Sequence, residues 1–147
     1  MNTQTENPIV EQEPIIVGTA PARPSESKGM IWTGRVMTAL PALMFVFSAI
    51  MKIAKPPAVL EGFAKSGIPE RLAPGIGILE LACVILYLIP RTAVLGAILL
   101  TGYLGGAIMT HLRVGEAWVG PAIFGVLVWG GIFLRDARLR ALIPLRK

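Results

Sequence analysis

Four long apolar segments constrain this chain more than any other feature. They run from about Met30 to Met51, Leu72 to Ile89, Thr92 to Leu112 and Ala117 to Leu134. A helix rises 1.5 Å per residue, so about 20 apolar residues are needed to cross roughly 30 Å of bilayer hydrocarbon. The pattern therefore predicts an all-α fold, an integral membrane four-helix bundle.

The first segment carries two residues that are uncommon in a spanning helix. Arg35 lies about one turn inside its start, where a long side chain can extend to the lipid head groups. Pro41 is expected to kink the helix, a distortion that membrane helices tolerate. Neither residue removes the prediction of a first crossing.

Charged residues are too few for a soluble globule. They make up 16% of the 147 residues, against about 25% in ordinary soluble domains, while hydrophobic residues make up 54%. Of nine acidic residues, four fall in the first 29 positions: Glu6, Glu11, Glu13 and Glu26. The others are too sparse to cover the surface of residues 30–147, so a water-soluble enzyme is not expected.

The single cysteine and the single histidine limit the chemistry further. Cys83 has no partner thiol in the chain, which excludes an internal disulfide, a CxxC redox pair and a cysteine-based zinc site. His111 alone cannot build a multi-histidine metal centre. We therefore expect no metal site.

Residues 1–29 differ in character from residues 30–147. Polar residues dominate them, and four prolines interrupt them, so they are expected to form a disordered tail. The first charge is the acidic Glu6, whereas a secretory signal begins with a basic region, so a cleaved signal is not expected. Residues 30–147 form the predicted transmembrane domain.

The connections between the apolar segments indicate a compact bundle. Short turns at 90–91 and 113–116 make successive helices antiparallel neighbours. The longer segment 52–71 contains Pro57, which can begin a helix, and Gly67, which can end one. We predict a short amphipathic helix there, lying in the membrane interface. An ordered loop packed on the mouth of the bundle is the alternative, and the two are compatible.

Lysine and arginine are distributed unevenly between the two predicted ends of the bundle. Nine lie on the side of the N-terminus: Arg23, Lys28, Arg35, Arg91, Arg135, Arg138, Arg140, Arg146 and Lys147. The opposite side has five: Lys52, Lys55, Lys65, Arg71 and Arg113. This bias predicts a multi-pass protein of the bacterial cytoplasmic (inner) membrane with both termini cytoplasmic. The basic C-terminal run is typical of contact with anionic lipid; nucleic acid is not an expected partner, because the run lacks a folded reading element.

Glu80 is the most informative single residue. It lies near the middle of the second segment, where a carboxylate is costly, so it must face the bundle interior, be protonated or pair with a cation. Tyr103 lies eight residues before His111, which places it about 12 Å below the outer boundary, at the depth of Glu80. A phenol there could donate a hydrogen bond to the carboxylate.

Further polar residues gather at the predicted outer mouth, namely Lys52, His111 and Arg113. A polar track could lead from His111 past Tyr103 to Glu80. One interpretation is a small pocket, open to the non-cytoplasmic side, for an anionic or quinone-like ligand. The other is a structural polar clasp around Glu80, with His111 and Arg113 only marking the interface.

Gly102 and Gly106 form a GxxxG pair in the third segment. Small residues at this spacing let helix backbones approach closely. We expect this pair to serve helix packing within the chain, with homodimerisation left open.

Residues about 31–146 resemble the DoxX-like family of small bacterial membrane proteins. The stretches that carry the resemblance are Phe47–Pro57, Glu61–Pro69, Gly77–Cys83, Ile89–Gly96, Thr101–Ala107, Thr110–Gly115 and Leu134–Arg140. The resemblance implies a four-helix membrane protein, and its pattern matches the polar positions Lys52, Glu80, Tyr103, His111 and Arg113. The wider group includes subunits associated with thiosulfate–quinone oxidoreduction and with membrane redox complexes, which makes quinone the cofactor suggested by analogy.

Three functions are consistent with these features. The first is a binding or accessory subunit of a membrane redox system, with a pocket around Glu80 for a quinone or a small anion. The second is a structural or chaperone-like membrane partner protein without catalysis. A minimal transporter is the third, and it is disfavoured because no inverted repeat is detectable.

Overall fold

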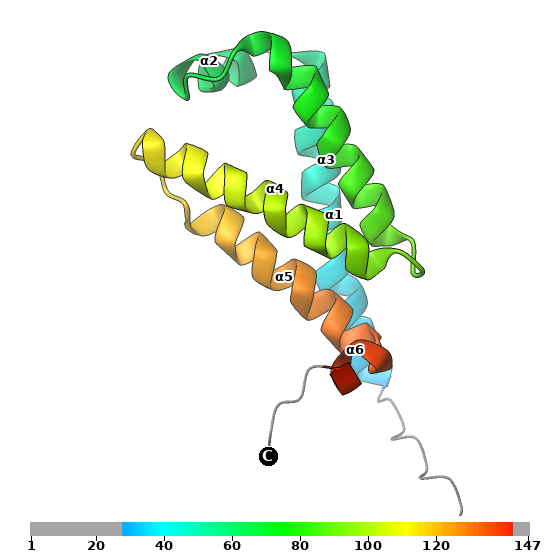
Figure 1. Ribbon diagram of the computed structural model, residues 1–147. Coiled ribbons are helices and arrows are strands. Elements are labelled where there is room, and N and C mark those ends of the chain that lie inside the picture. Colours follow the sequence, from blue (N-terminus) through cyan, green and yellow to red (C-terminus); the bar gives the residue numbers. More distant parts are fainter. Residues whose placement is uncertain (1–27, 143–147) are drawn as a thin grey trace, which may run out of the picture.

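The structure, a computed structural model, describes residues 28–142, and these are helical apart from short connections (Figure 1). The helices are α1 (Lys28–Ala54), α2 (Pro57–Lys65), the 3-10 helix η1 (Glu70–Leu72), α3 (Ala73–Leu88), α4 (Ala93–Arg113), α5 (Val119–Arg135) and α6 (Ala137–Leu142). The all-α prediction is confirmed, and α2 is the predicted short helix between the first two spans. The predicted tail lies outside the described residues except for its last two, which begin α1.

The four long helices form a closed ring. Helix α1 packs against α3 and α5, and α4 packs against the same two helices from the other side. The start of α1, the turn between α3 and α4, and α6 lie at one end of the bundle (Figure 1). Helix α2 and the loop between α4 and α5 lie toward the opposite end. This alternation is the one that short connections impose on successive antiparallel helices.

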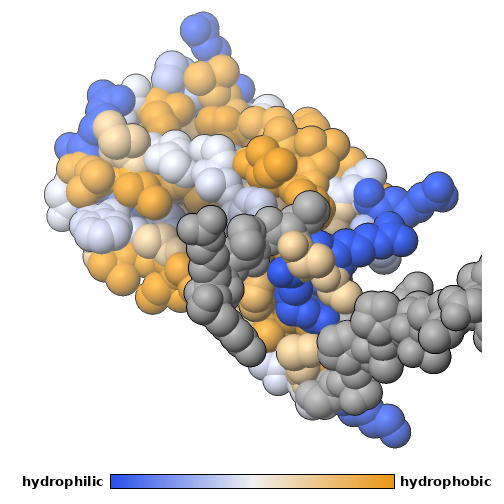
Figure 2. Space-filling model, turned by 60° about the horizontal axis from the view of Figure 1, so that its bottom comes forward, coloured by the Kyte–Doolittle hydropathy of each residue, from blue (hydrophilic) through white to orange (hydrophobic). Residues whose placement is uncertain are grey.

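The surface of the bundle is suited to lipid. Helix α1, η1 with α3, and α4 are each long and apolar enough to cross a membrane, and α5 is an apolar helix of 17 residues. Large apolar side chains such as Leu43, Phe47, Ile78 and Val126 are exposed. Figure 2 shows hydrophobic residues over the side of the bundle and hydrophilic residues gathered beside the end turned toward the viewer. The chain is therefore a multi-pass membrane protein.

The core is fullest where α3, α4 and α5 meet. Tyr87, Leu100 and Ile132 are among the largest completely buried side chains. The Tyr87 hydroxyl donates a hydrogen bond of 3.0 Å to the carbonyl of Val128, so this buried polar atom is satisfied. The Arg135 guanidinium donates a hydrogen bond of 3.3 Å to the backbone carbonyl of Tyr87. These contacts fix the end of the bundle that lies away from α2.

Two local features hold the helix ends in place. In the turn before α4, the Thr92 hydroxyl donates to the Leu86 carbonyl at 2.8 Å, which satisfies a carbonyl at the end of α3. After α5, the Asp136 carboxylate accepts the Arg138 backbone N–H at 2.9 Å and so begins α6. Helix α1 continues through Pro41, which is buried against the bundle.

Candidate functional site

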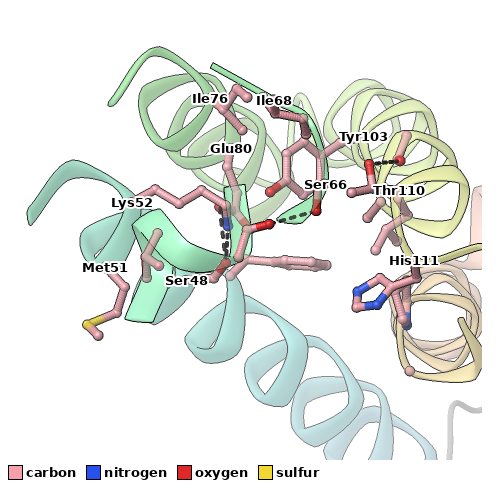
Figure 3. A pocket seen from close by; sticks show the side chains of 18 of the residues that line it. Ser48, Met51, Lys52, Ser66, Ile68, Ile76, Glu80, Tyr103, Thr110 and His111 are labelled. Atoms are coloured by element: carbon pink, nitrogen blue, oxygen red, sulfur yellow. Dashed lines mark hydrogen bonds and ion pairs between the residues drawn. The ribbon is translucent and has the colours of Figure 1, made fainter. Parts of the chain in front are cut away.

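A buried ion pair lies between α1 and α3. The Glu80 side chain is 1% exposed, and its Oε2 atom lies 3.0 Å from Lys52 Nζ. Ser48 Oγ donates to the same oxygen at 3.3 Å, and the Lys52 ammonium also donates to Ser48 Oγ. Ser48 and Lys52 are one helical turn apart on α1, so both side chains leave the same face toward Glu80 (Figure 3). The structure thus gives the carboxylate a cation and a hydroxyl.

Aromatic rings line the space beside this pair. The Lys52 Nζ atom lies 5.9 Å from the centre of the Tyr103 ring. The Phe45 ring meets Tyr103 edge-on at a centroid distance of 6.4 Å and lies 5.7 Å from Phe124. Helices α1, α4 and α5 therefore each contribute one aromatic side chain to the boundary of this space.

The ion pair and the rings border one large cavity. Its volume is about 880 Å³, and its walls come from α1, α3, α4 and α5, with residues of α2 such as Val59 and Phe63 across one end. Ligand pockets commonly have volumes of about 300–1,000 Å³ and combine apolar walls with a few placed polar groups. The described residues therefore provide room and chemistry for a small, predominantly apolar molecule.

A second polar cluster lies where α2 meets the loop after α4. Lys65 Nζ lies 2.7 Å from Glu116 Oε1, and His111 Nδ1 lies 3.3 Å from Glu116 Oε2. The His111 contact is not aligned as a hydrogen bond, since Nδ1 has no hydrogen-bond partner among the described residues. The Lys65 ammonium holds the pKa of the Glu116 carboxyl below its ordinary value, with a smaller contribution from His111. Glu116 is therefore ionised throughout the neutral pH range.

The structure brings four of the five predicted ligand-binding residues to the cavity. Lys52, Glu80, Tyr103 and His111 all line it. Arg113 is exposed and is not among the lining residues, so a role for it in ligand binding stays a prediction.

The predicted packing role of Gly102 and Gly106 within the chain is wrong. A Cβ atom at either position would meet no atom within 4 Å, and both glycines line the cavity. Close helix contacts occur at other glycines, where a Cβ would lie 2.8 Å from the Ala49 carbonyl oxygen at Gly77 and 3.0 Å from the Thr38 backbone nitrogen at Gly131. The GxxxG spacing marks an open face, not a close helix contact.

Sequence reasoning missed several cavity residues. Ser48 could have been found, because it precedes Lys52 by one turn. The aromatic residues Phe45, Phe63 and Phe124 carried no signal that separated them from lipid-facing ones. The pairing of Lys65 with Glu116 joins positions 51 residues apart and had no local pattern.

Within residues 28–142 no group of three or more histidine, cysteine, aspartate or glutamate side chains could hold a metal ion. The fold and the cavity define a small multi-pass membrane protein with an internal polar site. Comparison with known families matches residues 36–131 to the DoxX-like family, and the chain belongs to that family. Neither the curated proteins nor the solved structures give a match.

Proposed function

We propose that this protein is a binding or accessory subunit of a membrane redox system, and that its cavity takes a lipid-soluble molecule of the quinone class. One observation carries the proposal: an apolar cavity of about 880 Å³ has the Lys52–Glu80 pair in its wall. The two charges compensate each other, and the Glu116 carboxylate, which also lines the cavity, is paired with Lys65, so the wall carries no uncompensated charge. Such a wall suits an uncharged ligand that carries a few hydrogen-bond acceptors.

The electrostatics favour a quinone over a small anion. An anion beside Lys52 would also lie close to the Glu80 carboxylate and would lose its hydration in an apolar cavity, which is costly. A lysine ammonium has three N–H groups, and two are directed to Ser48 and Glu80. The third can donate to a ligand carbonyl, while the rings of Phe45, Tyr103 and Phe124 offer faces and edges to a flat ring.

The chain has one cysteine and no partner thiol for it, so it has no dithiol of its own to deliver electrons. A partner subunit would supply them to the bound quinone. The residues of this chain bind the ring, orient its carbonyl groups toward Lys52 and keep bulk water away from them.

Filling the cavity should reduce binding of the ligand. Replacing Gly106 with leucine adds a side chain to an open position in the cavity wall. The affinity for decylubiquinone is expected to fall about tenfold or more, which corresponds to about 1.4 kcal/mol. Native mass spectrometry and a binding titration of the protein in lipid nanodiscs measure the effect.

Gly105 provides the matched control, because it is adjacent, has equally open space and does not line this cavity. Gly105→Leu should leave the affinity within about twofold of the parent. Equal affinity of the two leucine variants would place the ligand outside the cavity. Displacement of decylubiquinone by thiosulfate would favour the small-anion alternative.

We further propose that the end of the bundle with α6 faces the cytoplasm. Among residues 28–142 this end carries six cations and one acid: Lys28, Arg35, Arg91, Arg135, Arg138, Arg140 and Asp136. The other end carries five cations and three acids: Lys52, Lys55, Lys65, Arg71, Arg113, Glu61, Glu70 and Glu116. Arg23, Arg146 and Lys147, the other three of the nine cations assigned to this end from the sequence, lie outside the described residues. The excess of lysine and arginine supports the cytoplasmic assignment.

Single cysteines in the two loops test this orientation. In a Cys83→Ala background, Ala117→Cys lies in the loop before α5 and Pro90→Cys in the turn before α4. A membrane-impermeant maleimide added to spheroplasts should label position 117 and should reach position 90 only after the membrane is broken. The reverse labelling pattern would invert the assignment.

A further inference from the structure

Helix α2 covers one end of the cavity without being built into the bundle. Val59 and Phe63 of α2, and Ser66 directly after it, line the cavity, and so does Ile68 further along. Yet none of the residues of α2 is fully buried, and its backbone packs mainly on η1 rather than on the four long helices. Figure 1 shows α2 set to one side of the bundle, beyond the ends of α1 and α3. The segment therefore lies over the cavity with few contacts that would fix it.

The two ends of α2 are bounded by left-handed backbone. Lys55 has φ 53° and Gly67 has φ 68°. Glycine adopts this conformation freely, whereas for lysine it is unfavourable. Short segments in such conformations break the helical hydrogen bonding on both sides of α2. They separate α2 from α1 on one side and from η1 and α3 on the other.

An ion pair links the C-terminal end of α2 to a distant part of the chain. Lys65, in the last turn of α2, reaches Glu116 in the loop after α4. Glu116 is held in position, because its backbone N–H donates to the His111 carbonyl at 2.9 Å and Gly115 turns the chain with φ 71°. The Lys65 and Glu116 side chains are 59% and 45% exposed, and an exposed ion pair stabilises only weakly and is screened by salt.

We propose that α2 is a gate over the cavity and that the Lys65–Glu116 pair is its latch. Breaking the pair lets α2 swing away on 55 and 67 and opens the cavity to a ligand; forming it closes the cavity. The gate regulates entry of the ligand to the site of the proposed function, so the inference rests on that function. The gate itself can be tested without any quinone.

The test uses a reporter cysteine inside the cavity. In a Cys83→Ala background, Ala107→Cys places a thiol at a half-buried position on the cavity wall, and its rate of modification by N-ethylmaleimide reports how often the cavity opens. Adding Lys65→Ala removes the latch through a residue that does not itself line the cavity, and it should raise this rate roughly two- to fivefold. Adding Glu61→Ala removes an exposed carboxylate of α2 that belongs neither to the latch nor to the cavity wall, and it should leave the rate unchanged.

Chemical bridging gives the opposite perturbation. This protein has no reporter cysteine. It carries Lys65→Cys and Glu116→Cys in the Cys83→Ala background, and a bismethanethiosulfonate joins the two cysteines. Entry of decylubiquinone should then slow about tenfold or more and recover when the bridge is reduced. Equal N-ethylmaleimide rates in the Lys65→Ala and Glu61→Ala proteins, or undiminished entry after bridging, would overturn the gate. If the latch variants change the N-ethylmaleimide rate but decylubiquinone binds to none of the proteins, the gate stands and the quinone proposal fails.

Discussion

Replacing Lys52 with methionine is expected to destabilise the folded protein by about 3–5 kcal/mol, because it leaves the Glu80 carboxylate buried without its cation. Glu80 is 1% exposed and lies in the middle of α3, so it cannot reach water by changing its rotamer. Ser48 remains as a hydrogen-bond donor at 3.3 Å, but a hydroxyl does not compensate a full charge. The midpoint of thermal unfolding in detergent measures the loss.

The complementary variant should cost less. In Glu80→Leu the unpaired charge is that of Lys52, whose side chain is 17% exposed and lies in the last turn of α1. Its long stem can carry the ammonium toward the mouth of the cavity, as lysine side chains do near helix ends. The order of stability should therefore be parent, then Glu80→Leu, then Lys52→Met. Equal unfolding midpoints for Lys52→Met and the parent would show that the pair does not contribute to the fold.

The double variant Lys52→Met with Glu80→Leu separates the structural role of the pair from its role in binding. Replacing both members of a buried ion pair with apolar residues is often neutral or stabilising, so most of the lost stability should return. Binding of decylubiquinone should not return, because the donor proposed for its carbonyl is absent. If the double variant bound the quinone as the parent does, the pair would be the structural clasp that the sequence also allowed.

Features that depend on a short stretch of the chain could be predicted from the sequence, whereas features that depend on contacts between distant segments could not. Hydropathy located the four apolar helices to within a few residues, since the length of apolar sequence needed for a crossing is set by the bilayer. The cost of a carboxylate in lipid was enough to expect Glu80 inside the bundle. Helical period could not separate Arg113 from the cavity, because Arg113 follows Gly106 by seven residues and Gly102 by eleven, and both glycines line the cavity.

The partner of Glu80 needed information that a single sequence does not contain. Helical rise placed Tyr103 at the depth of Glu80 and placed Lys52 at the mouth. The rotation and tilt of α1 against α3 bring Lys52 Nζ to 3.0 Å from the carboxylate, and these are set by packing between helices, not by spacing along either one. The latch between Lys65 and Glu116 was missed for the same reason, because it depends on where a loop meets α2.

The packing of the glycines is where the structure differs most from what the sequence predicted. Substitution of Gly96 is the second change expected to have a large effect on stability. A Cβ atom at this position would lie 2.5 Å from Tyr87 Cα and 2.7 Å from the Leu86 carbonyl carbon. Both are backbone atoms of α3, so no side-chain rotation can make room and α3 must move away from α4. Gly96→Ala is therefore expected to destabilise the protein by about 3 kcal/mol, at the upper end of the range for overpacking.

Gly102→Ala is the matched control on the same helix, because its added methyl group would meet no atom within 4 Å. Alanine is the better helix former by up to about 1 kcal/mol, so this variant should unfold at the parent's temperature or above it. Unfolding midpoints in one detergent compare the two substitutions directly, and similar midpoints would contradict the close contact at Gly96. A large difference would follow from position alone: Gly96 meets the backbone of a neighbouring helix, whereas Gly102, despite its GxxxG spacing, faces a cavity.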